Sequence, residues 1–238
     1  MVVGMTRFPL GPLLPQWAPS PVPPREVLHG RFCRVEPLAE SHAPSLWAAN
    51  ARDADGGMWT YMAYGPWAQE SDYRTWVVES ARSSDPLFFA IIDGVSGQAV
   101  GVASYLRLDP HNGVIEVGHL AYSPLLQRTP AATEAMYLMM ARIFALGYRR
   151  YEWKCHALNA PSRMAAQRFG FSYEGLFRQA AVVKGRSRDT AWYSIIDTEW
   201  SALRAAYERW LDPVNFDANG RQRIALSTLT SPMIAAKG

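Results

Sequence analysis

The sequence predicts an α/β domain built on a mixed sheet. Stretches with the period-2 alternation of strands are interspersed with stretches that repeat apolar residues at helical spacing. A strand that runs directly into a well-capped helix stands near the middle of the chain, between residues 114 and 147. Hydrophobic residues make up 49% of the 238 residues, which is ample for a core. We therefore expect one large domain with extensions.

The N-terminal segment, residues 1–27, holds seven of the 17 prolines and favours extended, polyproline-like conformations. Five apolar side chains that a bare linker would not need are spaced among these prolines: Phe8, Leu10, Leu13, Leu14 and Trp17. The segment is either an arm that packs on the domain or on a partner subunit, or a flexible tail. We place the domain at residues 28–212, followed by an irregular C-terminal tail at 213–238.

Strands and helices are expected to alternate through residues 28–212. The period-2 pattern predicts strands at 31–38, 88–93, 100–108, 114–121, 150–157, 173–183 and 190–196. The helical pattern predicts helices at 41–50, 70–83, 130–146, 161–169 and 199–211. A Gly/Ser turn at 94–97 joins two of the strands, and Lys184-Gly185-Arg186 turns a hairpin.

The central helix has clear start and stop signals. Thr129 is a good N-cap, because its hydroxyl can accept a hydrogen bond from an unpaired amide of the first turn. Pro130 follows at the first helical position, where its missing N–H is harmless. Gly147 ends an apolar face of seven residues: Ala132, Ala135, Met136, Met139, Met140, Ile143 and Phe144. A strand that leads into a helix N-terminus makes an anion site, which a cofactor with a pyrophosphate needs.

Bulk properties bear on location and partners. The net charge of +3 is too small to indicate nucleic-acid binding by itself. Cys33 and Cys155 fall in predicted strands with no CxxC and no metal-ligand spacing, so we expect no metal and a reducing cytoplasm. No apolar run reaches membrane-spanning length, and the N-terminus has no signal-peptide pattern. We expect a cytoplasmic protein without membrane or nucleic-acid partners.

Several motifs together resemble one enzyme family. The loop Gln127-Arg-Thr-Pro-Ala-Ala132 is similar to the acetyl-CoA loop of the GNAT N-acetyltransferases, and Thr133-Glu134-Ala135 is typical of the branch that acetylates ribosomal-protein N-termini. The resemblance covers roughly residues 28–200 and continues in Asn159-Ala-Pro-Ser162, Arg168-Phe-Gly-Phe171, Tyr173-Glu-Gly175, Arg178, Gly185, Asp189 and Tyr193-Ser194. It implies the splayed GNAT sheet flanked by helices, with acetyl-CoA wedged between two parallel strands that part.

The resemblance also implies which residues hold acetyl-CoA. These are Leu120, Ala121, Gln127, Arg128, Thr129, Ala131, Ala132, Thr133, Asn159 and Ser162. Pro130 stands where the family usually has its first loop glycine, so phosphate binding shifts to the amides from Arg128 to Ala132. Ala166 stands where many members place a tyrosine acid, which makes the Ser162 hydroxyl the better candidate to bond the leaving thiolate. Ser162 can also be a plain N-cap.

Acetyl transfer to an amine needs a base for the ammonium proton. Glu116 is the first candidate, because burial in an apolar strand beside the cofactor loop would raise its pKa. Glu152 and His156 share a strand face with Lys154 and are alternative bases. A solvated strand face remains the other interpretation of all three residues. His119 alternates to the face opposite Glu116, and the bulge that the resemblance implies here could re-aim it; a packed, hydrogen-bonded histidine is the other interpretation.

The stretch from Met58 to Trp67 is rich in aromatic residues and borders the acceptor pocket in the family. Its acceptor-binding candidates are Trp59, Tyr61, Tyr64 and Trp67, together with His119. Core packing is the alternative. No Asp or Glu lies between Gly56 and Ala68, which favours peptide N-termini and small hydrophobic amines over polycationic antibiotics. Four flanking carboxylates could still turn inward, namely Asp53, Asp55, Glu70 and Asp72.

The residues and the resemblance together predict an acyltransferase that moves an acetyl group from acetyl-CoA directly to an amine. The acceptor is a protein or peptide N-terminus or a small molecule, and a homodimer is possible. Two other classes stay open: a non-catalytic acyl-CoA-binding sensor or interaction module, and a basic module associated with RNA or the ribosome. A steep loss of binding with salt would favour the last of these.

Overall fold

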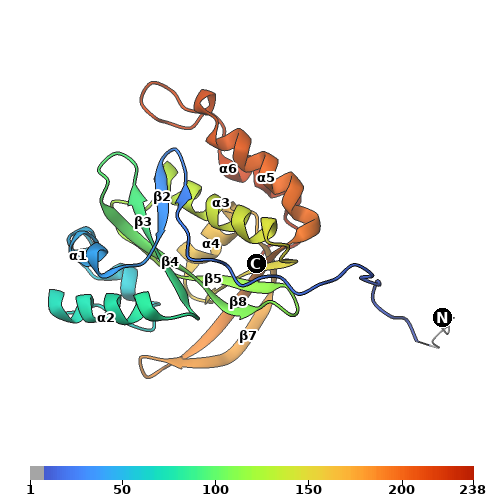
Figure 1. Ribbon diagram of the computed structural model, residues 1–238, viewed down its shortest axis with the longest axis horizontal. Coiled ribbons are helices and arrows are strands. Elements are labelled where there is room, and N and C mark those ends of the chain that lie inside the picture. The colour runs from blue at the N-terminus through green and yellow to red at the C-terminus, as the bar shows by residue number, and fades with distance from the viewer. Residues whose placement is uncertain (1–7) are drawn as a thin grey trace.

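One mixed sheet of eight strands organises residues 8–238, the part of the chain that the computed structural model describes (Figure 1). The strands lie in the order β1-β2-β3-β4-β5-β6-β8-β7. Their bounds are β1 Leu28–His29, β2 Cys33–Pro37, β3 Leu87–Asp93, β4 Ala99–Asp109, β5 Val114–Tyr122, β6 Arg150–His156, β7 Ser172–Val183 and β8 Arg186–Ile196. All neighbouring strands pair antiparallel except β5 and β6, which are parallel.

Helices cover both faces of the sheet. Their bounds are α1 Ala43–Asn50, α2 Glu70–Arg82, α3 Pro130–Ala145, α4 Ala160–Arg168, α5 Asp197–Leu211 and α6 Leu226–Thr230. In Figure 1, α1 and α2 lie to the left of the sheet, and α3 and α5 to its right. Side chains alternate between two cores along β3: Phe89 and Ile91 pack in the core of α3 and α5, and Phe88 and Ala90 in that of α1 and α2. The predicted α/β architecture is therefore confirmed.

The sheet is splayed where β5 and β6 part. The two strands pair only from Val114 with Arg150 to Val117 with Trp153. Beyond that point β5 continues beside β4, and β6 continues beside β8. We call the opening between residues 118–122 of β5 and 154–156 of β6 the notch. It lies at the carboxyl ends of the two parallel strands, which is where open α/β sheets commonly bind ligands.

The C-terminal tail, predicted to be irregular, contains one short helix and packs on the domain. Residues 226–230 form α6, and Leu226 is fully buried in the core of α5. The Thr230 hydroxyl donates a 3.0 Å hydrogen bond to the Arg168 carbonyl, and the Tyr173 amide donates to the Ala236 carbonyl at 2.9 Å. A five-residue helix is unstable alone, so packing on α4 and α5 holds it, and local sequence patterns do not report such packing.

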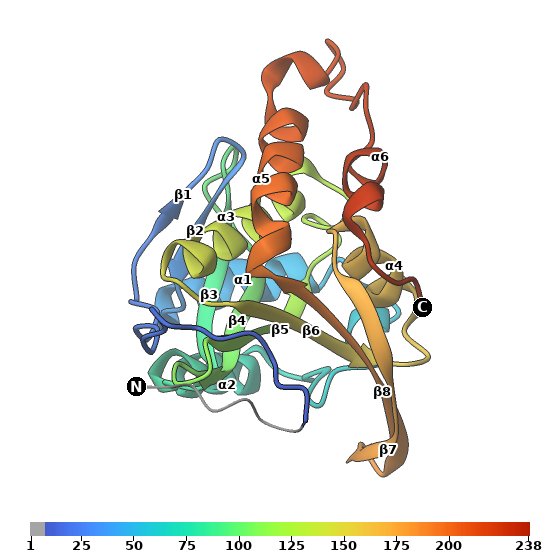
Figure 2. The same ribbon diagram turned by 90° about the vertical axis from the view of Figure 1, so that its right-hand side faces the viewer.

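The β7–β8 hairpin extends beyond the rest of the sheet (Figure 2). Strand β8 begins at Arg186, four residues before the predicted start, because the two strands pair as far as Val183 with Arg186. Within residues 8–238, no helix is long and apolar enough to cross a membrane.

The N-terminal segment packs on its own domain from Trp17 onward. The Trp17 indole N–H donates a 3.1 Å hydrogen bond to the His111 carbonyl, and its ring lies 5.4 Å from the Arg149 guanidinium. Farther along, Glu26 pairs with Arg142 of α3 at 2.5 Å. Leu10, Leu13 and Leu14 are exposed, and the first described residues lie away from the domain (Figure 1). The predicted arm therefore docks in cis over its second half.

We expect Trp17→Ala to lower the free energy of unfolding by about 1–3 kcal/mol, because the change removes a packed ring and its hydrogen bond. Deletion of residues 1–27 should lower the melting temperature further. Leu13→Ala is the matched control, since Leu13 is exposed and should change stability by less than about 0.5 kcal/mol. Urea denaturation and light scattering measure stability and mass. A truncated protein with unchanged melting temperature and mass would show that the segment is only a tail.

Candidate active site

The loop between β5 and α3 is built around Thr129. Its Oγ1 accepts a 3.2 Å hydrogen bond from the Ala132 amide, so Thr129 is the N-cap and Pro130 the first helical residue, as predicted. The same hydroxyl donates to the Leu126 carbonyl at 2.7 Å. Arg128 precedes the cap in the left-handed region, with φ of 62°. This tight turn sets the start of α3 directly beyond the end of β5.

The amides available to an anion at this helix start are fewer than predicted. The Thr129 amide donates to the Leu126 carbonyl at 3.3 Å, and the Ala132 amide to the Thr129 hydroxyl. The amides of Arg128 and Ala131 have no acceptor among residues 8–238. With Pro130 lacking an N–H, these two donors and the helix dipole make up the anion site. Gln127 is near the site, where its Nε2 donates to the Tyr122 carbonyl at 2.7 Å.

The next two residues of this helix are tied to the core. The Thr133 side chain is buried and accepts a 3.1 Å hydrogen bond from Arg168 Nη1, so it faces away from the loop. The buried Glu134 carboxylate accepts from the amides of Arg31, Phe32 and Cys33, between β1 and β2. Glu134 therefore fixes α3 to the first strands, a structural role for a residue singled out by the family motif.

Glu116 lies at the base of the notch with 3% of its surface exposed. Its Oε2 is 2.9 Å from Lys154 Nζ and 2.5 Å from Arg107 Nη1. The expected burial is confirmed, but the expected apolar surroundings are wrong. The neighbours Ile115 and Val117 point into the core under α3, on the other face of the sheet, whereas Glu116 meets two cations on its own face.

Glu152 is the register partner of Glu116 on β6 and is held more completely. Its Oε2 lies 2.7 Å from Lys154 Nζ, and its Oε1 lies 2.7 Å from Arg150 Nε. Arg150 also donates to Glu174 on β7 at 2.7 Å. Charges of opposite sign thus alternate from Arg107 on β4, through the side chains of β5 and β6, to Glu174 on β7. Because both of its oxygens are engaged, Glu152 is not a free base, and the structure does not support that candidate role.

A bulge in β5 re-aims His119. Gly118 pairs with Ser104 and Ala121 with Val102, so two residues of β5 lie opposite one residue of β4. His119 has φ of 50°, and its ring stacks on Tyr64 with centroids 5.5 Å apart. His119 Nδ1 lies 3.1 Å from the Tyr64 hydroxyl. The bulge therefore overrides simple alternation and brings His119 to the face that carries Glu116.

The environment of His119 disfavours its protonated form. Burial, with a contribution from the Arg107 cation, lowers its pKa from 6.5 to about 4. His156 lies across the notch, and its Nδ1 accepts a 3.1 Å hydrogen bond from the Leu158 amide. Burial and Arg188 lower the pKa of His156, while Asp189 opposes them. Both imidazoles are therefore neutral near pH 7, with one nitrogen of each already engaged.

Asn159 and Ser162 lie at the start of α4. Asn159, not Ser162, is the N-cap of α4, and its Oδ1 accepts from the Ser162 amide at 3.1 Å. The Ser162 hydroxyl oxygen accepts a 3.1 Å hydrogen bond from the Trp153 indole N–H. Since an indole N–H only donates, the hydroxyl hydrogen of Ser162 stays available for another acceptor. Cys155 beside it is buried, which raises the pKa of its thiol and leaves it unreactive.

The aromatic residues of 58–67 divide into two groups. Trp59, Tyr64 and Trp67 pack on one another and on α2, with Trp59 and Trp67 centroids 5.1 Å apart. The contacts of these three residues are therefore those of core packing. Tyr61 instead contacts the His156 ring, with centroids 5.0 Å apart, and donates to the Leu158 carbonyl at 3.1 Å. Tyr61 is thus the aromatic side chain that this stretch presents at the end of β6.

Sequence reasoning missed the cations of this site. Lys154 is 8% exposed in its side chain, joins both carboxylates, and lies 3.8 Å from the Trp192 ring. Arg188 Nε is buried and has no hydrogen-bond partner in residues 8–238. Lys184 at the hairpin tip donates to the Trp59 carbonyl at 2.8 Å. The available signal was the run of charges at every second position of β6, which is unusual for a central strand.

Replacing Lys154 with Met should destabilise the protein by about 3–5 kcal/mol, because two buried carboxylates would then face each other without their shared cation. The control is Arg204→Met, which breaks an exposed pair with Glu208 on α5 and should leave stability nearly unchanged. Urea denaturation at pH 7 measures both. Equal effects of the two substitutions would mean that Lys154 is not an essential counter-ion.

The low pKa of His119 predicts a loss of stability in acid. Between pH 6.5 and 4 the unfolded chain binds a proton that the folded protein does not bind. The contribution of His119 is therefore complete above pH 6.5 and is lost as the pH falls through 4, by at most about 3 kcal/mol. His119→Gln should flatten this part of the profile measured by urea denaturation, whereas His29→Gln on the exposed β1 should not. A profile that His119→Gln leaves unchanged would contradict the burial argument.

Comparisons with known proteins agree with this geometry. A family model described as an acetyltransferase (GNAT) domain matches residues 33–172. The crystal structure of a GCN5-related N-acetyltransferase from Brucella melitensis is 48% identical, covers 92% of this chain and 100% of that chain, and has a TM-score of 0.89. A probable GNAT-family acetyltransferase from Chromobacterium violaceum is 39% identical over 82% of this chain and 98% of its own, with a TM-score of 0.76.

A more distant structure shares the fold alone. The acetyltransferase from Salmonella typhimurium that modifies the N-terminal serine of ribosomal protein L7/L12 is 20% identical, covers 72% of this chain and 99% of that chain, and has a TM-score of 0.62. No curated protein matches the chain. The family model spans more than half of the sequence, and the Brucella protein matches nearly all of it. The chain therefore belongs to the GNAT acetyltransferases and takes its acetyl group from acetyl-CoA.

Proposed function

We propose that the protein transfers the acetyl group directly to an amine across the notch between β5 and β6. One observation carries this proposal. The two parallel strands stop pairing after Val117 and Trp153. Strand β5 then leads to the start of α3, where the amides of Arg128 and Ala131 are free of acceptors among residues 8–238. A donor with an extended arm and a pyrophosphate fits this arrangement, because unpaired strand edges bond amides and helix starts bond phosphates.

In this proposal the donor lies along the notch. The backbone of Leu120 and Ala121, which has no β6 partner, bonds the amides of the pantetheine arm. The pyrophosphate accepts from the amides of Arg128 and Ala131, with Gln127 beside it. The side chain of Asn159 contributes from the opposite wall through its amide nitrogen, since its oxygen caps α4. The thioester would then lie near the bulge at His119.

Ser162 is proposed to bond the leaving sulfur. Its oxygen accepts from Trp153, so its hydrogen is free to be donated to a thiolate. Cys155 is the neighbouring acceptor for that hydrogen, because the Ser162 hydroxyl lowers the pKa of its thiol against the larger effect of burial, so the sulfur of coenzyme A would replace Cys155 as the acceptor. A hydroxyl that stabilises negative charge on one sulfur can do so for the sulfur of coenzyme A when that group lies in the notch.

Glu116 is proposed to receive the proton of the acceptor amine. Lys154 and Arg107 hold its Oε2, and its Oε1 lies beside Gly118. A Cβ at Gly118 would stand 2.9 Å from Leu106 Cδ2 and 3.6 Å from Oε1, so a side chain at this position would crowd both residues. The amine nitrogen attacks the thioester carbon, the C–S bond breaks, and the nitrogen's proton passes to Glu116. His119 and Tyr61 border the same face and are proposed to orient the acceptor.

The acceptor class remains a proposal: a protein or peptide N-terminus, or a small-molecule amine. The ribosomal-protein acceptor of the Salmonella enzyme is one member of that class. A cytoplasmic location is inferred from Cys33 and Cys155, which are both free and buried. A homodimer that covers the exposed apolar residues of the N-terminal segment is likewise proposed.

Thiol release from acetyl-CoA, measured over a panel of amines and N-terminal peptides, tests the function. Glu116→Gln should lower kcat by roughly 10²-fold or more and leave acetyl-CoA affinity nearly unchanged. Ser162→Ala should slow transfer to every amine by a similar factor, because it acts on the leaving group. Glu208→Gln on exposed α5 is the control. Full turnover of Glu116→Gln at every pH would show that Glu116 has only a structural role. The absence of thiol release with every amine tested would contradict the proposed reaction.

A further inference from the structure

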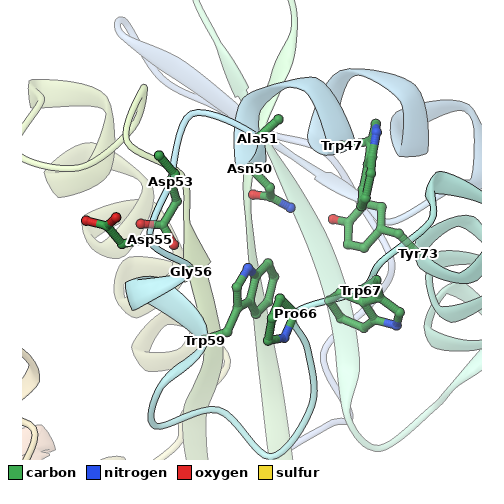
Figure 3. A pocket seen from close by; sticks show the side chains of 11 residues that line it. Trp47, Asn50, Ala51, Asp53, Asp55, Gly56, Trp59, Pro66, Trp67 and Tyr73 are labelled. Carbon is green, nitrogen blue, oxygen red and sulfur yellow. The ribbon is translucent and has the colours of Figure 1, made fainter.

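A second pocket lies between the end of α1, the loop that follows it and the start of α2 (Figure 3). It encloses about 320 Å³. Four aromatic residues are among those that line it: Trp47, Trp59, Trp67 and Tyr73. Its lining residues all lie between positions 47 and 73, so none belongs to β5, β6 or α3. The pocket is therefore distinct from the notch that is proposed to hold acetyl-CoA.

The pocket contains a buried acceptor without a donor. Asn50 is 8% exposed, and its Oδ1 has no hydrogen-bond partner among residues 8–238. Figure 3 shows its amide pointing into the space between Asp53, Trp59 and Tyr73. The Tyr73 hydroxyl is also buried and has no hydrogen-bond partner within the described part of the chain. Burial raises its pKa and the adjacent Asn50 amide partly lowers it, without well-formed hydrogen-bond geometry between the two groups. Leaving such groups unsatisfied destabilises a protein, so a ligand that supplies donors would be favoured here.

The charge at the pocket is negative. Asp53 and Asp55 line it, and no Lys, Arg or His is among the residues that form it. Asp53 is held in place by its Oδ2, which accepts a 2.9 Å hydrogen bond from the Met58 amide. Asp55 is exposed at the mouth. These are two of the four carboxylates that flank the aromatic stretch in the sequence; the Asp53 side chain points toward the pocket, and the Asp55 side chain points away from it (Figure 3).

We propose that this pocket binds a primary alkylammonium group. An ammonium has three donors and no acceptor, which matches the Asn50 oxygen, the Tyr73 hydroxyl oxygen and a carboxylate. Aromatic faces attract a cation within about 6 Å of the ring centre and also accommodate an alkyl stem. A neutral alcohol would satisfy the acceptors but gain nothing from the carboxylates. The site does not depend on acetyl transfer, since its residues are apart from the notch.

Titration with propylammonium chloride in the absence of acetyl-CoA tests the site, with indole N–H signals of the nine tryptophans observed by NMR. The signals of Trp59 and Trp67, assigned with Trp→Phe variants, should move and saturate. Those of Trp153 and Trp192, on β6 and β8, should not move. Sodium chloride at equal ionic strength and 1-propanol serve as the salt and neutral controls. Equal shifts with 1-propanol would reduce the pocket to an apolar cavity and overturn the proposal, as would no saturable shift.

Two variants sharpen the test. Asn50→Leu removes the unpartnered oxygen at similar volume and should weaken propylammonium binding at least 10-fold. Asp55→Asn changes an exposed side chain, so it should leave the fold intact, and it should weaken propylammonium binding about 3-fold or more. Asp72→Asn on exposed α2, outside the pocket, should leave binding unchanged. Unchanged affinity in Asp55→Asn, or an equal loss in Asp72→Asn, would overturn the assignment even if Asn50→Leu proves unstable.

Discussion

The buried ion pair between Glu116 and Lys154 joins the two halves of the sheet at the point where they separate. The strands β5 and β6 share only four paired positions, and the pair lies beside the last of them. Lys154 bridges to Glu152 as well, so neither carboxylate is left buried without a counter-ion. The proposed proton acceptor is held by this pair at the base of the notch.

The two faces of the sheet divide the chemistry between them. The face under α3 supplies an apolar core and a helix whose first turn can bond an anion, and Glu134 anchors that helix to the first strands. The opposite face carries Glu116 and the re-aimed His119, with the aromatic cluster of α1 and α2 behind them. A donor wedged through the notch would reach both faces, so the acetyl group could meet an amine on the second one.

Local signals identified the donor side of the site better than the acceptor side. Thr129 and Pro130 were recognisable because capping depends on residues within one turn. Ser162 and Asn159 both satisfy the local preference for an N-cap, so the sequence allows a cap at Ser162, and the structure assigns it to Asn159. The environment of Glu116 could not be predicted, since its two cations come from other strands, 9 positions before it and 38 after it. The sequence also does not distinguish core packing from substrate contact for Trp59 and Trp67, because an aromatic-rich stretch suits both roles.

The sequence by itself determined the α/β class, most helix and strand positions, the helix start beyond β5 and the family. These features rest on periodicity, capping and motif order, which act over a few residues. Only the tertiary structure decided which charges pair around Glu116, which way His119 points, and that residues 226–238 pack on the domain. Each of these depends on contacts between segments far apart in the chain, where burial and electrostatics override local preference.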